Sequence, residues 1–255
     1  MKQSQTTLVS NIEVMPGSHL LWLQAPEIAA VARPGQFVMV RCGEETTLPR
    51  PLSIHQTAGD KLALLFTVVG RGTQWLCRRQ PGEKVNMFGP LGNGFTIHPD
   101  STDLLLVAGG IGIAPLRFLA DEAVRQGKRV TLLYGTPDKN RYPENLLPGG
   151  IAMVAATEDG ATGKRGRATE FLPECIDRAD QVFACGPVGM YHALADYSRQ
   201  FPIVKTAQIS LEMRMGCGLG VCYGCTVKTK DGLKQVCQDG PVFKLEDILW
   251  GELSG

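Results

Sequence analysis

The sequence predicts a multidomain protein that joins an all-β part to an α/β part, and three observations support this. Up to about residue 99, short apolar runs are broken by proline and glycine, which is typical of an antiparallel β-barrel. Strand and helix patterns then alternate, as in a doubly wound parallel sheet. The last part is poor in apolar residues and holds four of the eight cysteines. We expect domains at residues 1–99, 100–209 and 210–255.

Length and charge limit the classes of function. At 255 residues the chain lies near the size at which a single core stops growing, so several domains are expected. A formal net charge of +1 gives no basic field that would attract nucleic acid or anionic lipid. No apolar stretch is long enough to span a bilayer, and the polar start does not resemble a signal peptide. We expect a cytoplasmic protein with no nucleic-acid or membrane partner.

Strands are expected in the first domain wherever an apolar run occurs. The runs cover residues 19–23, 36–41, 62–69 and 84–88, and a short helix is expected to begin with Thr73 as its N-cap. Arg50-Pro51-Leu52-Ser53 and Gly70-Arg71-Gly72-Thr73 together suit a flavin dinucleotide. Arg50 would neutralise the pyrophosphate, glycine would let backbone N–H groups approach it, and Ser53 would bond the isoalloxazine edge. Taken singly, each motif is more often a plain turn or loop.

The second domain is expected to hold a dinucleotide at the carboxyl ends of its strands. Strands are predicted at residues 104–107, 130–134, 151–155, 181–184 and 204–209, with helices at 114–126 and 188–199. The loops that follow two of these strands contain Gly109, Gly110 and Gly112, and Cys185, Gly186 and Pro187. The first loop is not the usual dinucleotide fingerprint, and Cys185 is either a nicotinamide contact or a small buried thiol.

The choice between NAD and NADP stays open at this point. Asp138 is placed to accept a hydrogen bond from a ribose hydroxyl, whereas Lys139 and Arg141 are placed to pair with a 2′-phosphate. The four histidines show neither triad nor metal spacing, and no catalytic acid or base is expected.

The cysteine cluster is the most specific motif in the chain. Cys217, Cys222 and Cys225 have the spacing C-x4-C-x2-C, and Cys237 follows later, as in plant-type [2Fe-2S] ligation. Neighbouring glycines allow backbone N–H groups to bond the cluster sulfurs. The alternatives are a structural zinc site and reduced thiols, but zinc ligands usually come as two separated pairs. We predict a [2Fe-2S] centre.

These motifs occur in the order found in ferredoxin-reductase-like flavoproteins. The segments at residues 211–217 and 237–243 also resemble the carboxyl-terminal module of the dihydroorotate dehydrogenase B electron-transfer subunits. The resemblance covers the whole chain. It implies a barrel that binds FAD, a second domain that receives NAD, and a cluster module facing an FMN-containing catalytic subunit, in a heterotetramer with two copies of each subunit.

The resemblance also assigns residues and a path for electrons. It implies FAD contacts from Arg50, Pro51, Leu52, Ser53, Leu65, Phe66, Thr67, Gly72 and Thr73, although the family often has arginine where this chain has Thr67. Electrons would pass from dihydroorotate through FMN, the cluster and FAD to NAD+ in pyrimidine biosynthesis. A flavin is needed because nicotinamide accepts a hydride whereas the cluster passes single electrons.

Two other functions agree with the same motifs. One is the flavoprotein subunit of another NAD(P)H-linked complex, of the sulfhydrogenase or NADH-ferredoxin transhydrogenase type. The other is a redox sensor whose cluster controls an interaction. The residues after the last cysteine, Asp239 to Phe243, favour the dihydroorotate complex.

Overall fold

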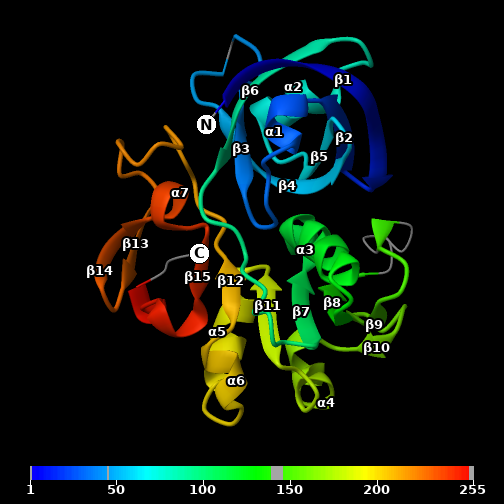
Figure 1. The fold of residues 1–255 in the computed structure, drawn as a ribbon, viewed down its shortest axis with the longest axis vertical. Coiled ribbons are helices and arrows are strands. Elements are labelled where there is room, and N and C mark those ends of the chain that lie inside the picture. Colours follow the sequence, from blue (N-terminus) through cyan, green and yellow to red (C-terminus); the bar gives the residue numbers. More distant parts are fainter. Residues whose placement is uncertain (1, 45, 139–145, 253–255) are drawn as a thin grey trace.

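A computed structural model describes residues 2–44, 46–138 and 146–252 of the chain (Figure 1). A β-barrel lies at the top of Figure 1, an α/β region lies below it, and the cysteine-rich segment lies beside both. Among the described residues, none of the helices combines the length and apolarity needed to cross a membrane.

The barrel closes in the strand order β1-β2-β5-β4-β3-β6. Its elements are β1 (Lys2–Met15), β2 (Ser18–Gln24), α1 (Pro26–Ala29), β3 (Phe37–Val40), β4 (Arg50–Ala58), β5 (Lys61–Thr67), α2 (Arg71–Cys77) and β6 (Lys84–Leu91). Buried side chains such as Leu21, Val38 and Leu64 fill its interior. The sequence did not reveal β1, because this long strand has mostly polar side chains and few buried apolar ones.

The α/β region is a sheet in the order β10-β9-β8-β7-β11-β12-β15, parallel except for its last pair. Its strands are β7 (Asp103–Gly109), β8 (Arg129–Thr136), β9 (Ala152–Thr157), β10 (Lys164–Arg165), β11 (Gln181–Cys185), β12 (Gln208–Ser210) and β15 (Val242–Lys244). The helical elements are η1 (Gly110–Gly112), α3 (Ile113–Arg125), η4 (Ala168–Phe171), α4 (Leu172–Ile176), α5 (Val188–Tyr197) and α6 (Pro202–Lys205).

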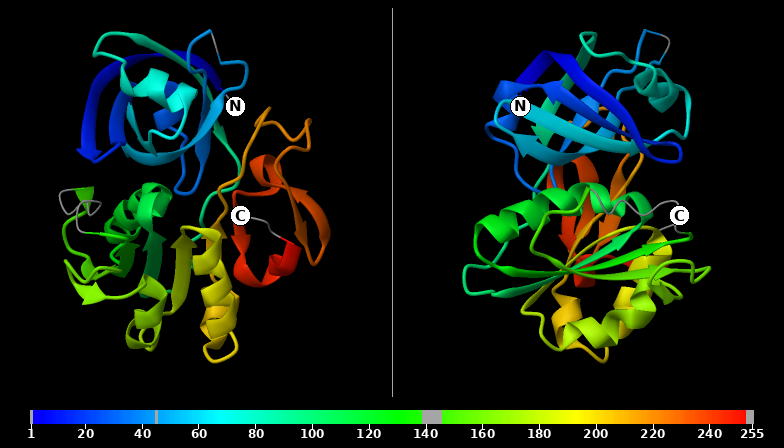
Figure 2. Two further views of the ribbon diagram at one scale, coloured as in Figure 1. Left: turned by 180° about the vertical axis from the view of Figure 1, so that it is seen from behind. Right: turned by 90° about the vertical axis from the view of Figure 1, so that its right-hand side faces the viewer.

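Helices cover both faces of this sheet, with α3 on the side of the barrel and α4 to α6 on the opposite side (Figure 2). Along β7, Leu104 and Leu106 pack with α3, whereas Leu105 and Val107 pack with α4 and α5. Because both faces of β7 are buried, its sequence is a continuous apolar run.

One expected strand is wrong in part. Residues 204–209 were expected to be extended, but Pro202 opens the helix α6 and the strand β12 begins only at Gln208. Proline suits the first position of a helix, and Val204 is fully buried, so an apolar run of this length did not distinguish a helical turn from a strand.

The cysteine-rich segment adds its last strand to the sheet. It contains β13 (Thr226–Thr229), β14 (Gly232–Gln235), α7 (Val236–Asp239), β15, η5 (Leu245–Asp247) and η6 (Trp250–Glu252). β15 pairs with β12, and Cys225 and Cys237 share one apolar cluster with Met39 of the barrel. The division of the chain at residues 99/100 and 209/210 stays a prediction.

Candidate functional site

A cavity of about 650 Å³ lies between the barrel and the α/β region. Most residues expected to contact FAD line it, namely Arg50, Pro51, Leu52, Ser53, Leu65, Phe66, Thr67 and Thr73. They come from β4, β5 and α2, which the closed barrel brings to one rim. A cavity with mostly apolar walls that is also lined by two arginines, Arg50 and Arg214, fits a flavin dinucleotide.

Gly72 is not part of the cavity wall, but it determines where Arg50 lies. A Cβ at Gly72 would stand 2.7 Å from Nε of Arg50, so only glycine leaves room for the guanidinium. Thr73 is not the N-cap of α2, because Gly70 holds that position. The Thr73 hydroxyl instead accepts hydrogen bonds from the N–H groups of Val69 and Gly70, at 2.9 and 3.2 Å.

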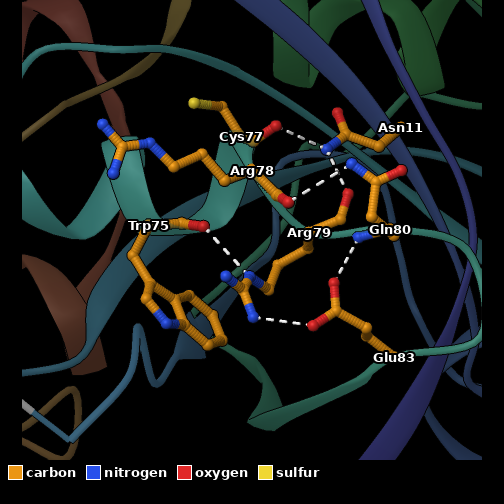
Figure 3. Close-up of polar contacts among 7 residues, drawn as sticks. All are labelled: Asn11, Trp75, Cys77, Arg78, Arg79, Gln80 and Glu83. Atoms are coloured by element: carbon orange, nitrogen blue, oxygen red, sulfur yellow. Dashed lines mark hydrogen bonds and ion pairs between the residues drawn. The ribbon is translucent and has the colours of Figure 1, made fainter.

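The other end of α2 is fastened to the barrel, as Figure 3 shows. Nδ2 of Asn11 on β1 donates to the carbonyls of Cys77 and Arg79, both at 2.8 Å. Arg79 pairs with Glu83 at 2.7 Å and lies over the Trp75 ring, 4.4 Å from its centre. Carbonyls at a helix end lack partners within the helix, so Asn11 satisfies groups that would otherwise need water.

A second cavity, of about 580 Å³, follows the carboxyl ends of the parallel strands. The expected residues Gly109, Gly110, Gly112, Gly186 and Pro187 line it. A Cβ at Gly112 would lie 2.1 Å from the carbonyl oxygen of Cys185, so the two loops approach more closely than any side chain allows. The strand order reverses between β7 and β11, where ligands bind in open α/β sheets.

Cys185 does not line this cavity. Its thiol is fully buried, and burial raises its pKa well above the usual value. Tyr191 lies beside it and joins the ends of β11 and β12: its hydroxyl accepts from the N–H of Gly186 at 3.0 Å and donates to the carbonyl of Ser210 at 2.6 Å. Cys185 therefore lies among the buried residues beneath the loop and not in the cavity wall.

The two cavities meet at Ile111 and Glu212, which line both of them. The Glu212 side chain is accessible from the cavities yet surrounded by protein, and this desolvation raises its pKa. Neither residue was singled out from the sequence. Glu212 belongs to the segment before Cys217, which supports the family resemblance but indicates no role for this side chain. Only the fold brings Glu212 to this junction.

Cys217, Cys222 and Cys225 lie on the loop that precedes β13, and Cys237 lies on α7. The thiols lie in two pairs within hydrogen-bond reach, Cys217 with Cys222 and Cys225 with Cys237. Backbone N–H groups point at the sulfurs: Gly220 donates to Sγ of Cys237 at 3.1 Å and Leu219 donates to Sγ of Cys217 at 3.3 Å.

The protonation of these thiols follows their surroundings. Burial alone would raise the pKa of Cys217, but N–H donors and the Cys222 thiol outweigh it and lower that pKa to about 6. Burial and the neighbouring Cys225 thiol raise the pKa of Cys237 to about 12. In the described part of the chain, no three potential ligands surround a single ion position. A tetrahedral zinc ion needs all four thiols around one position, whereas a two-iron cluster takes one pair for each iron. Two pairs that are separate in space, with N–H donors to sulfur, therefore fit a two-iron cluster better.

The cysteine loop packs directly on the barrel. A Cβ at Gly218 would lie 2.6 Å from Cγ of Met39, and Met215, two residues before Cys217, lines the flavin cavity. Neither Met39 nor Met215 was expected as part of a site, since nothing in their sequence context separates them from core residues. The thiol site is thus adjacent to the flavin cavity.

These features define a class: a ferredoxin-reductase-like flavoprotein with an added iron–sulfur module. Residues 212–249 match the family described as the iron-sulfur cluster binding domain of dihydroorotate dehydrogenase B. The chain belongs to the family of electron-transfer subunits of dihydroorotate dehydrogenase B. It is 39% identical to the NAD(+) electron transfer subunit of that enzyme from Desulforamulus reducens, over 93% of this chain and 94% of the relative. The subunit from Clostridium acetobutylicum is 35% identical, over 98% and 99%.

Solved structures agree with the architecture. A chain of an NADH-dependent reduced ferredoxin-NADP oxidoreductase superposes with a TM-score of 0.89 and 27% identity, over 98% of this chain and 91% of that one. A ferredoxin NADP+ reductase from Neisseria gonorrhoeae gives a TM-score of 0.68 at 18% identity, over 82% of this chain and 98% of that one, and shares the fold. The expected fold class and family are confirmed, and so are the electron-transfer role and its three cofactors, FAD, an iron–sulfur cluster and NAD.

Proposed function

We propose that this chain passes electrons between NAD and an FMN-containing catalytic subunit that oxidises dihydroorotate, in pyrimidine biosynthesis. The observation that carries the proposal is the contact of three sites in one chain. The dinucleotide and flavin cavities share Ile111 and Glu212, and the flavin cavity also touches Met215 beside the thiol loop. When bound, FAD exchanges a hydride with nicotinamide and single electrons with an iron–sulfur centre.

In this proposal each predicted side chain has a task of binding or orientation. Arg50 neutralises the FAD pyrophosphate, and Gly72 leaves room for it. Gly109, Gly110 and Gly112 let the dinucleotide approach the end of β7, while Gly186 and Pro187 line the side toward β11. Tyr191 holds that loop in place. Cys217, Cys222, Cys225 and Cys237 bind the iron atoms, and no residue acts as acid or base.

Apolar side chains around the thiol loop support a partner at this face. Leu219, Val221 and Tyr223 are 44%, 72% and 67% exposed, and the neighbouring Cys222 is exposed as well. Exposed apolar side chains that are neighbours mark an interaction site more often than single exposed ones do. We propose that the catalytic subunit covers this patch, in a cytoplasmic heterotetramer with two copies of each subunit.

The test is to purify the chain anaerobically with its bound partner and to measure NADH formation from dihydroorotate and NAD+. The wild-type complex is expected to form NADH. Cys222→Ser is expected to lose cluster iron and this activity, while NADH still bleaches the flavin, because the two cavities do not include Cys222. Cys175→Ser is the matched control and is expected to keep both reactions.

Another electron-transfer complex is the second candidate, since the oxidoreductase of TM-score 0.89 shares this fold over nearly the whole chain. A purified complex that oxidises NADH but ignores both dihydroorotate and orotate would reject the dihydroorotate assignment. The same preparation would then be assayed with reduced ferredoxin and NADP+.

A further inference from the structure

The dinucleotide cavity has two distinguishable ends. Ile111 and Glu212 border the flavin cavity, so a nicotinamide ring that exchanges a hydride with the flavin would be held at this end. Thr136, Pro137 and Glu158 line the same cavity at the ends of β8 and β9, which lie on the other side of β7 from β11. Thr136, Pro137 and Glu158 would then hold the adenosine half of the coenzyme.

Glu158 is the first residue after β9, and its backbone is held in place. Its N–H donates to the carbonyl of Thr136 at 3.3 Å, which ties the end of β9 to the end of β8. The side chain is exposed and lines the cavity. The ion pairs among the described residues include none with Glu158.

We infer that Glu158 makes this chain select NAD over NADP by accepting hydrogen bonds from the adenosine ribose. The two coenzymes differ only by a phosphate on the 2′-hydroxyl. A carboxylate accepts a hydrogen bond from a free hydroxyl, whereas it repels a 2′-phosphate. This inference deepens the proposed function, because it rests on the dinucleotide occupying this cavity.

The other charges near this end do not replace Glu158. Asp138, the carboxylate expected from the sequence, is not among the residues that line the cavity. Lys139 and Arg141, the expected phosphate partners, lie outside the described residues. Arg167 lines the cavity and would attract phosphate of either coenzyme. In the native protein the negative charge of Glu158 opposes the attraction of Arg167 for the additional 2′-phosphate of NADP.

The test compares Glu158→Gln with Asp159→Asn, which removes the same charge from the next residue of the same loop. Asp159 accepts from the N–H of Ala161 at 2.9 Å and does not line the cavity. In the FAD-loaded chain, the rate of flavin reduction is measured at varied NADH and NADPH. Calorimetry on the same protein measures binding of adenosine 5′-monophosphate and of its 2′-phosphorylated counterpart.

Glu158→Gln is expected to lower the preference for NADH over NADPH, and for the unphosphorylated nucleotide, by about tenfold, as expected for a lost bond to a charged group. Asp159→Asn is expected to leave both ratios within about twofold of wild type. Unchanged ratios in Glu158→Gln, or an equal shift in Asp159→Asn, would overturn the inference while NADH still reduces the flavin. If neither coenzyme reduces the flavin of the wild-type chain, the proposed function itself fails.

Discussion

At the scale of the residue, Gly72 controls the position of a charge rather than the stability of the fold. A Cβ there would meet the flexible end of Arg50, whose side chain can move away at little cost. Gly72→Ala is therefore expected to leave thermal unfolding nearly unchanged and to weaken FAD binding about tenfold or more, because a charge-assisted bond to the pyrophosphate is lost. Titration of the apoprotein with FAD measures this.

The matched control is Gly70→Ala, two residues earlier. No atom lies within 4 Å of a Cβ at Gly70, and its backbone is extended, so alanine fits there. This variant is expected to bind FAD within about threefold of wild type, since a Cβ at this position does not meet Arg50. Alanine is a poorer N-cap than glycine, so the variant is expected to unfold at a lower temperature instead. Equal affinity in both variants would contradict the role given to Gly72.

At the scale of the element, α2 depends on β1 for its orientation. Asn11 donates through Nδ2 to the carbonyls of Cys77 and Arg79 (Figure 3). Its Oδ1 lies 2.9 Å from Nδ1 of His19. Asn11→Ala is expected to cost about 1–2 kcal/mol, because partly buried carbonyls are left without partners. The midpoint of thermal unfolding then falls by a few degrees.

Asn86→Ala on β6 is the control for this prediction. Asn86 is exposed, and replacing such a residue usually changes stability by less than about 0.5 kcal/mol. A midpoint for Asn11→Ala that equals that of Asn86→Ala would show that β1 does not fasten α2.

At the scale of the whole molecule, a neutral histidine lies between the barrel and the α/β region. His55 on β4 is 1% exposed, and its Nδ1 lies 3.0 Å from the carbonyl oxygen of Ala114 on α3. Burial lowers the pKa of His55 from 6.5 to about 4, and Arg117 opposes a further positive charge. The unfolded chain therefore binds a proton more readily than the folded chain between these pH values.

Stability is accordingly expected to be unaffected by this group above pH 6.5 and to fall as the pH decreases toward 4, by roughly 3 kcal/mol in all. His55→Asn keeps a donor near the Ala114 carbonyl and does not titrate, so its unfolding midpoint should depend less on pH in this window. His98→Asn, at an exposed position, is the control. An identical pH profile in wild type and His55→Asn would exclude the effect.

The sequence alone determined what depends on local pattern. Alternating apolar runs and the spacing of Cys217 to Cys237 are properties of neighbouring residues, and they were sufficient for the fold class and the cluster. The glycine loops were weak signals singly, and FAD and NAD followed from the resemblance that their order along the chain supports. Local pattern failed at β1, whose side chains are mostly polar, and at residues 204–209, where a short apolar run suited both a helix and a strand.

Only the tertiary structure decided how the sites meet. Glu212, Ile111, Met39 and Met215 gain their places through contacts between segments far apart in the chain, which no local pattern records. The same holds for Glu158, which the pairing of β8 with β9 brings to the end of the dinucleotide cavity. The residue types of each loop are fixed by neighbouring positions in the sequence, whereas the contacts that bring the loops together depend on packing between distant segments.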